Sequence, residues 1–121
     1  MDAILDTSVI IELFKGNRKM LERFSKDLVY GISVISLFEL HCGTLKGREE
    51  IFLDKIPKLS YDENSAKLAG KIFRELRKEG KMPKVKDLLI ASSAIASDKI
   101  LITRDSDFEV FRKFGLRVEF V

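Results

Sequence analysis

Short apolar runs bounded by polar residues recur along the chain and predict β-strands. Runs of this length, rich in isoleucine and valine, are typical of strands rather than helices. The clearest four lie at residues 3–5, 32–35, 100–103 and 118–121. A weaker run at 56–59 contains a proline. Because proline cannot donate a ladder hydrogen bond, we expect this run at a sheet edge.

Two longer segments have the apolar spacing of helices. The first runs from about residue 62 to residue 79 and ends before Gly80 and Pro83. The apolar face of this helix comprises Ala66, Ala69, Ile72, Phe73 and Leu76. The second, 84–96, is apolar or small nearly all round, which predicts a helix covered on most sides. Strands that alternate with helices predict an α/β fold, with a parallel sheet and helices on both faces.

Acidic residues follow two of the predicted strands. In open parallel sheets, ligands bind beyond the carboxyl ends of the strands. Asp6 comes directly after the first run, and Asp105 comes shortly after the third. Asp6 could instead cap the following helix, since Asp, Thr and Ser all accept from the free N–H groups of a first turn. Both roles are compatible if Thr7 or Ser8 caps the helix and Asp6 binds a metal.

Glu39 has two interpretations. The run Ser36-Leu37-Phe38-Glu39 matches a capping box, with Ser36 as N-cap and Glu39 reaching back to it. On local evidence this structural role is the stronger one. However, Glu39 also begins a helix after a strand-like run, which places it at the same sheet edge as Asp6.

Asp87 lies in a setting where a carboxylate is costly. It shares a helical face with Ile90, Ala91 and Ala94. Burying an ionised carboxylate without a partner costs several kcal/mol, so it should find a cation or become protonated. Lys84 or Lys86 could be a structural partner, and a divalent metal ion would serve as well. We favour a functional role.

A pair of aspartates follows the third strand, in Thr103-Arg104-Asp105-Ser106-Asp107. One of the pair is a good N-cap for the next helix. The Asp-x-Asp spacing together with Thr103 is also a frequent way of presenting oxygen ligands to a hard cation. We assign Asp105 to the metal and keep Asp107 as a peripheral candidate.

The length and composition indicate a soluble globular protein. The chain has 121 residues, 45% hydrophobic and 34% charged, which predicts one domain over residues 1–121. No apolar run approaches the roughly 18 residues that cross a bilayer. The N-terminus lacks the basic start and long apolar core of a signal peptide. We therefore expect a cytoplasmic protein with no membrane partner.

Charge and metal-ligand chemistry narrow the function. The net charge is +3, and the surface is more basic still if several acids are committed to a metal, which suits a polyanionic substrate. The chain has one Cys and one His, so it cannot assemble a Cys/His zinc site by itself. Ligands that are all oxygen atoms favour Mg²⁺ or Mn²⁺.

Four segments, in order along the chain, resemble the motifs of PIN-domain ribonucleases, and the size is similar to that of VapC-type toxins. They are Ile4-Leu5-Asp6-Thr7-Ser8-Val9-Ile10, Ser36-x-x-Glu39-Leu40, Asp87-x-x-Ile90-Ala91-x-x-Ala94 and Ile102-Thr103-Arg104-Asp105-x-Asp107-Phe108. The resemblance implies a three-layer α/β/α sandwich with a central parallel sheet of about five strands. It also implies a Mg²⁺- or Mn²⁺-dependent endoribonuclease, a homodimer, and inhibition by a small antitoxin.

The resemblance assigns roles to individual residues. Asp6, Glu39, Asp87 and Asp105 match the catalytic acidic quartet. We expect Asp6, Asp87 and Asp105 to bind metal, and Glu39 to be a ligand or to orient the attacking water. Thr7, Thr103 and Asp107 match supporting positions. Lys84, Lys86 and Arg104 are candidates for phosphate contact. Many members have glycine and an apolar residue before the third acid, whereas this chain has Pro83-Lys84-Val85-Lys86, which predicts a tighter and more basic approach loop.

Rival functions make different demands on the same residues. One is an inactive PIN-like module that binds RNA or protein, although an intact set of four acids argues against lost activity. Another is a housekeeping RNA-processing nuclease with the same chemistry. A phosphohydrolase with an aspartyl nucleophile needs a second Asp two residues after Asp6, where this chain has Ser8.

Overall fold

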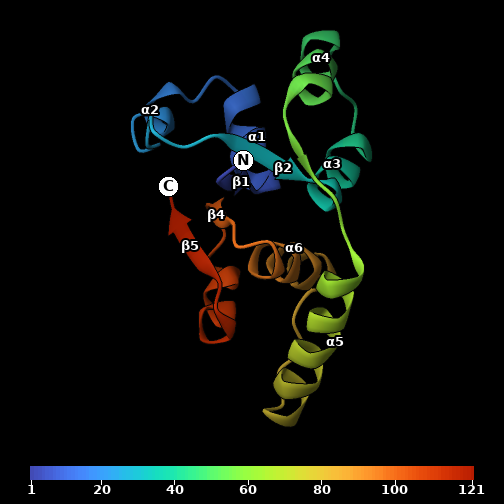
Figure 1. Ribbon diagram of the computed structural model, residues 1–121. Helices are drawn as coiled ribbons and strands as arrows, with labels where there is room; N and C mark the ends of the chain where they lie inside the picture. Colours follow the sequence, from blue (N-terminus) through green and yellow to red (C-terminus); the bar gives the residue numbers. More distant parts are fainter.

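The computed structural model describes all 121 residues and is built on a five-stranded parallel sheet (Figure 1). The strand order is β3-β2-β1-β4-β5, and every neighbouring pair is parallel. The strands are β1 (Ala3–Leu5), β2 (Tyr30–Ser33), β3 (Lys58–Leu59), β4 (Ile100–Thr103) and β5 (Arg117–Phe120). The weak proline-containing run therefore forms an edge strand, as predicted.

Helices cover both faces of this sheet. They are α1 (Thr7–Phe14), α2 (Arg18–Leu21), α3 (Val34–His41), α4 (Gly47–Lys55), α5 (Glu63–Lys78), α6 (Val85–Ala96) and the 3-10 helix η1 (Ser106–Phe114). Successive strand residues point to opposite faces, so Ile4 and Leu101 enter one core cluster while Leu5 and Ile102 enter the other. This confirms the expected three-layer arrangement. None of the helices is both long and apolar enough to cross a membrane.

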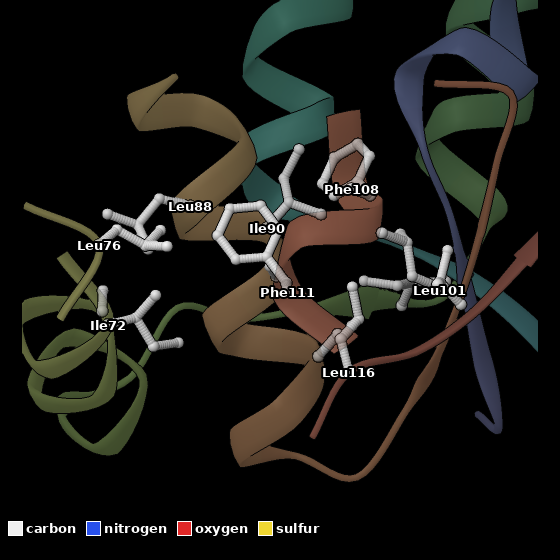
Figure 2. Packing of buried hydrophobic residues seen from close by; sticks show 13 residues of the cluster. Ile72, Leu76, Leu88, Ile90, Leu101, Phe108, Phe111 and Leu116 are labelled. Carbon is white, nitrogen blue, oxygen red and sulfur yellow. The ribbon is translucent and has the colours of Figure 1, made fainter. Parts of the chain in front are cut away.

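The larger cluster joins α5, α6 and η1 to the sheet. Figure 2 shows Ile90 of α6 beside Phe108 and Phe111 of η1, with Leu101 of β4 to their right in the same buried cluster. All four side chains are almost completely buried. Because α6 packs between α5 and η1, most of its surface is covered, as its nearly continuous apolar sequence predicted. Packing on several sides fixes the helix that carries Asp87.

Two strand boundaries and one helix face differ from the sequence-based expectation. The second strand ends at Ser33 rather than residue 35, because the Ser33 hydroxyl accepts from the backbone N–H of Ile35 at 2.9 Å and starts α3. The last strand begins one residue earlier than predicted, at Arg117. On α5 the buried face includes Ser65, whereas Ala66 is exposed.

The early start of α3 corrects the predicted capping box. Ser36 lies inside the helix and is fully buried, so it cannot be the N-cap. Glu39 therefore has no Ser36 cap to complete, and its carboxylate is available for contacts outside its own helix.

Candidate metal centre

Asp6 and the loop after β4 meet at the carboxyl edge of the sheet. Strands β1 and β4 are parallel neighbours, with Leu5 opposite Ile102. The backbone N–H of Asp6 continues the ladder by donating to the Ile102 carbonyl at 2.9 Å. The pairing therefore brings Asp6 beside Thr103 and the two aspartates that follow it, as the strand-end argument predicted.

Two hydroxyls hold one oxygen of Asp6. Ser8 Oγ and Thr103 Oγ1 each donate to Asp6 Oδ2 at 2.8 Å. The same hydroxyls accept from the backbone N–H groups of Arg104 and Asp105, at 3.1 and 3.0 Å. The loop after β4 is thus tied to Asp6 through two side chains. The second carboxylate oxygen, Oδ1, accepts no hydrogen bond from a side chain, and the nearby backbone N–H groups of Thr7 and Ser8 also favour the ionised form of Asp6.

These contacts change the interpretation of Asp6 as a helix cap. Asp6 occupies the N-cap position of α1, but its side chain makes no bond to the helix N–H groups. Only 5% of the residue is exposed, and this burial raises the pKa of its carboxyl although the two hydroxyls oppose the shift. A buried carboxylate with one free oxygen and a raised pKa is poised to meet a cation.

Asp87 enters from the first turn of α6 and is half-buried. Burial raises the pKa of its carboxyl to about 6, and the nearby carboxylates of Asp105, Asp6 and Asp107 push it in the same direction, while Lys84 opposes them. The repulsion shows that all four aspartates face a common region. Ile90, Ala91 and Ala94, which share a helical face with Asp87, are buried, and this confirms the predicted apolar face.

Asp105 combines a structural contact with a place in the cluster. Its Oδ1 accepts from the backbone N–H of Asp107 at 2.9 Å and caps η1. Carboxylate oxygens of Asp87, Asp105 and Asp107 all lie within 4.8 Å of one another, close enough to hold one metal ion. This group of three contains Asp107, which the sequence analysis kept only as a peripheral candidate, and it does not contain Asp6.

Glu39 lies outside that trio. Its Oε1 accepts from Thr7 Oγ1 at 3.1 Å, and its Oε2 pairs with Lys86 Nζ at 3.1 Å. Thr7, predicted as a supporting hydroxyl, thus contacts Glu39 and not an aspartate. Lys84 pairs in turn with Asp107 Oδ2 at 3.3 Å. Lys84, at the N-cap of α6, and Lys86, in its first turn rather than in a loop, thus each pair with an acid at the site.

Two cavities flank the acids. One of about 410 Å³ is lined by Asp87 and Asp107, with Lys81 and Lys84 at its rim. The other, of about 520 Å³, is lined by Thr7 and Glu39 and includes Lys15, Lys46 and Arg48. Arg104 is exposed and lines a separate hollow with Lys19 and Arg23. An anion that reached the acidic cluster through either cavity would pass lysine or arginine side chains.

The donor set fits a hard divalent cation. Every candidate ligand atom of the cluster is a carboxylate oxygen, as Mg²⁺ and Mn²⁺ prefer. Burial raises the pKa of Asp87, and the neighbouring carboxylates of Asp105, Asp6 and Asp107 raise it further against the opposing charge of Lys84. Sequence reasoning missed Ser8 as part of this site, although its spacing two residues after Asp6 was a usable signal for the contact between their side chains.

Comparison with known proteins gives consistent matches. The PIN domain family model matches residues 3–113. Ribonuclease VapC3 of Methanocaldococcus jannaschii is 55% identical over 92 residues, which are 76% of this chain and 97% of that protein. A chain of the DNA-bound VapBC structure from Salmonella typhimurium is 30% identical with a TM-score of 0.84, covering 99% of this chain and 98% of its own. A chain of a toxin–antitoxin complex from Klebsiella pneumoniae is 25% identical with a TM-score of 0.71, and the match covers 88% of this chain and 90% of that chain.

Replacing Ser8 by alanine tests the hydroxyl contacts to Asp6. Because the Ser8 hydroxyl stabilises the ionised carboxylate, the variant should raise the pKa of Asp6 further, as NMR titration would measure. It should also lower the free energy of unfolding by about 1–2 kcal/mol, since the Arg104 N–H loses its acceptor. Ser106→Ala is the matched control, because Ser106 is exposed and its hydroxyl makes no hydrogen bond. An unchanged Asp6 pKa in Ser8→Ala would contradict this account.

The raised pKa of Asp87 predicts how the metal-free protein responds to pH. The folded state binds a proton on the Asp87 carboxyl more tightly than the unfolded chain does. The contribution of Asp87 to the free energy of unfolding is therefore full at low pH and is lost as the pH rises through about 6. Asp87→Asn should therefore stabilise the metal-free protein above that pH by about 1 kcal/mol, a modest gain because solvent screens a half-exposed group. The gain should vanish near pH 4, as urea unfolding would show. The exposed Asp54→Asn is the control, and a gain independent of pH would contradict the assignment.

Proposed function

This chain belongs to the PIN domain family, and we propose that it is a metal-dependent endoribonuclease acting as the toxin of a toxin–antitoxin pair. The observation that carries the proposal is the convergence of Asp87, Asp105 and Asp107 within 4.8 Å, beside the strand-end Asp6. A relative named as a VapC ribonuclease supports RNA as the substrate. A structural neighbour that is a toxin–antitoxin complex supports the biological role over RNA processing.

We propose Mg²⁺ or Mn²⁺ as the cofactor, held by aspartates alone. Asp87 and Asp105 are the central ligands, Asp107 joins them from the same cluster, and Asp6 offers its free Oδ1 directly or through water. A divalent ion bound there would lower the pKa of an attacking water and stabilise negative charge developing on the phosphate.

The chain's own side chains would do the positioning. Ser8 and Thr103 fix Asp6 Oδ2, which leaves Oδ1 free to orient an attacking water or to accept its proton. Lys84 is exposed at the rim of the cavity that Asp87 and Asp107 line, where its ammonium can contact a phosphate. Arg104 points to a different hollow and is therefore assigned to more distant parts of the RNA.

The partners follow from the same proposal. RNA is the substrate, and a small antitoxin protein is the inhibitor. Because the proposed substrate is RNA, we propose the cytoplasm as the place of action. Homodimerisation stays a prediction of the family resemblance.

The central test is cleavage of single-stranded RNA with Mg²⁺ present. Asp6→Asn and Asp87→Asn should each lower kcat/KM by at least about 100-fold, because each removes a charge that binds metal. Chelation of divalent ions should abolish cleavage by the wild type. The exposed Asp54→Asn should cleave normally. Undiminished cleavage by folded Asp6 and Asp87 variants would overturn the assignment.

The toxin role predicts a growth phenotype tied to the same residues. Induced expression in a bacterial host should arrest growth, and Asp87→Asn should relieve the arrest because it removes the cleavage activity. Co-expression of a small protein encoded beside this gene should also restore growth and should co-purify with the wild type. Active ribonuclease that leaves growth unaffected would indicate a processing nuclease instead.

A further inference from the structure

Glu39 differs from the aspartates because both of its carboxylate oxygens are engaged. Oε1 accepts from Thr7 on α1, and Oε2 pairs with Lys86 on α6. Its side chain is 19% exposed, so these two contacts replace much of its hydration. Glu39 also lies outside the group of carboxylates whose oxygens come within 4.8 Å of one another, which is formed by Asp87, Asp105 and Asp107. A hard cation bound by that group would not need an oxygen of Glu39.

We propose that Glu39 does not bind the metal ion but holds Lys86, whose ammonium supplies the positive charge that a second ion would bring. The centre then takes a single divalent ion, at Asp87, Asp105 and Asp107. This inference rests on the proposed metal-dependent function and specifies its stoichiometry. Glu39 is accordingly a positioning residue, and Lys86 is the group that it positions.

The placement of Lys86 and Asp87 supports this division. They are neighbours in the first turn of α6, so their side chains diverge around the helix. Asp87 faces Asp105 and Asp107 near η1, while Lys86 reaches Glu39 on α3, which packs against α6. One helix end thus presents a carboxylate to the metal cluster and an ammonium to the remaining acid.

The second lysine pair is different in kind. Lys84 and Asp107 have side chains that are 71% and 57% exposed, and such exposed pairs contribute about 0–1 kcal/mol. A metal ion can therefore displace Lys84 from Asp107 at little cost. Glu39 is more buried and also accepts a hydrogen bond from Thr7. Displacing Lys86 would therefore leave a poorly hydrated negative charge on Glu39 without its partner, which costs more free energy.

Titration with Mn²⁺, followed by the electron paramagnetic resonance of the free ion, tests the proposal without measuring activity. The wild type should bind one ion. Glu39→Gln should bind one ion with a Kd within about threefold of wild type, because it removes no ligand. Lys86→Met should gain a second site, since Glu39 is released, whereas Lys86→Arg should keep one. Lys113→Met is the matched control, because Lys113 pairs with Glu79 away from the centre.

The possible results separate this inference from the function on which it rests. Two wild-type ions of similar affinity, a loss of about tenfold or more in Glu39→Gln, or a single ion in Lys86→Met would each overturn it. Asp87→Asn should weaken the first ion at least about tenfold whether or not Glu39 is a ligand. If Asp87→Asn binds Mn²⁺ like the wild type, the metal centre itself is wrong, and both proposals fall.

Discussion

Repulsion between carboxylates gathered at one edge of a parallel sheet is the constraint on which the rest of this site depends. Burial of Asp87, together with the nearby carboxylates of Asp105, Asp6 and Asp107, raises its pKa to about 6. Folding brings these charges together because core packing on both faces of the sheet outweighs their repulsion. The cluster of carboxylates is therefore assembled by the fold itself.

Three of the acids are each held in position by a different kind of contact. Asp6 is held by two hydroxyls that also tie down the loop after β4. Asp105 is held by its cap on η1, and Asp87 by a helix packed on several sides. The positions of these three acids are therefore set by the fold itself, through two hydroxyls, a helix cap and core packing.

Two lysines divide the acids into groups with different chemistry. Lys84 forms an exposed pair with Asp107, while Lys86 forms a less exposed one with Glu39. The family resemblance places Glu39 and Asp87 in one quartet, although the local pattern favours a cap for Glu39 and a functional role for Asp87. The structure separates them by position, since Asp87 lies in the cluster with Asp105 and Asp107 while Glu39 contacts Thr7 and Lys86.

The acidic residues at the strand ends were determined by the sequence itself, because short apolar runs predicted the strands and a parallel sheet gathers their carboxyl ends. Apolar periodicity likewise predicted α5, α6 and the covered setting of Asp87. The role of Glu39 was decided only by tertiary structure. Its local pattern indicated a cap on Ser36, but Ser33 started the helix earlier and freed the carboxylate for Thr7 and Lys86, from two other helices. The place of Asp107 and the contact of Ser8 with Thr103 and Asp6 were decided in the same way. Such contacts join residues up to 97 positions apart, and local patterns carry no information about distances of that kind.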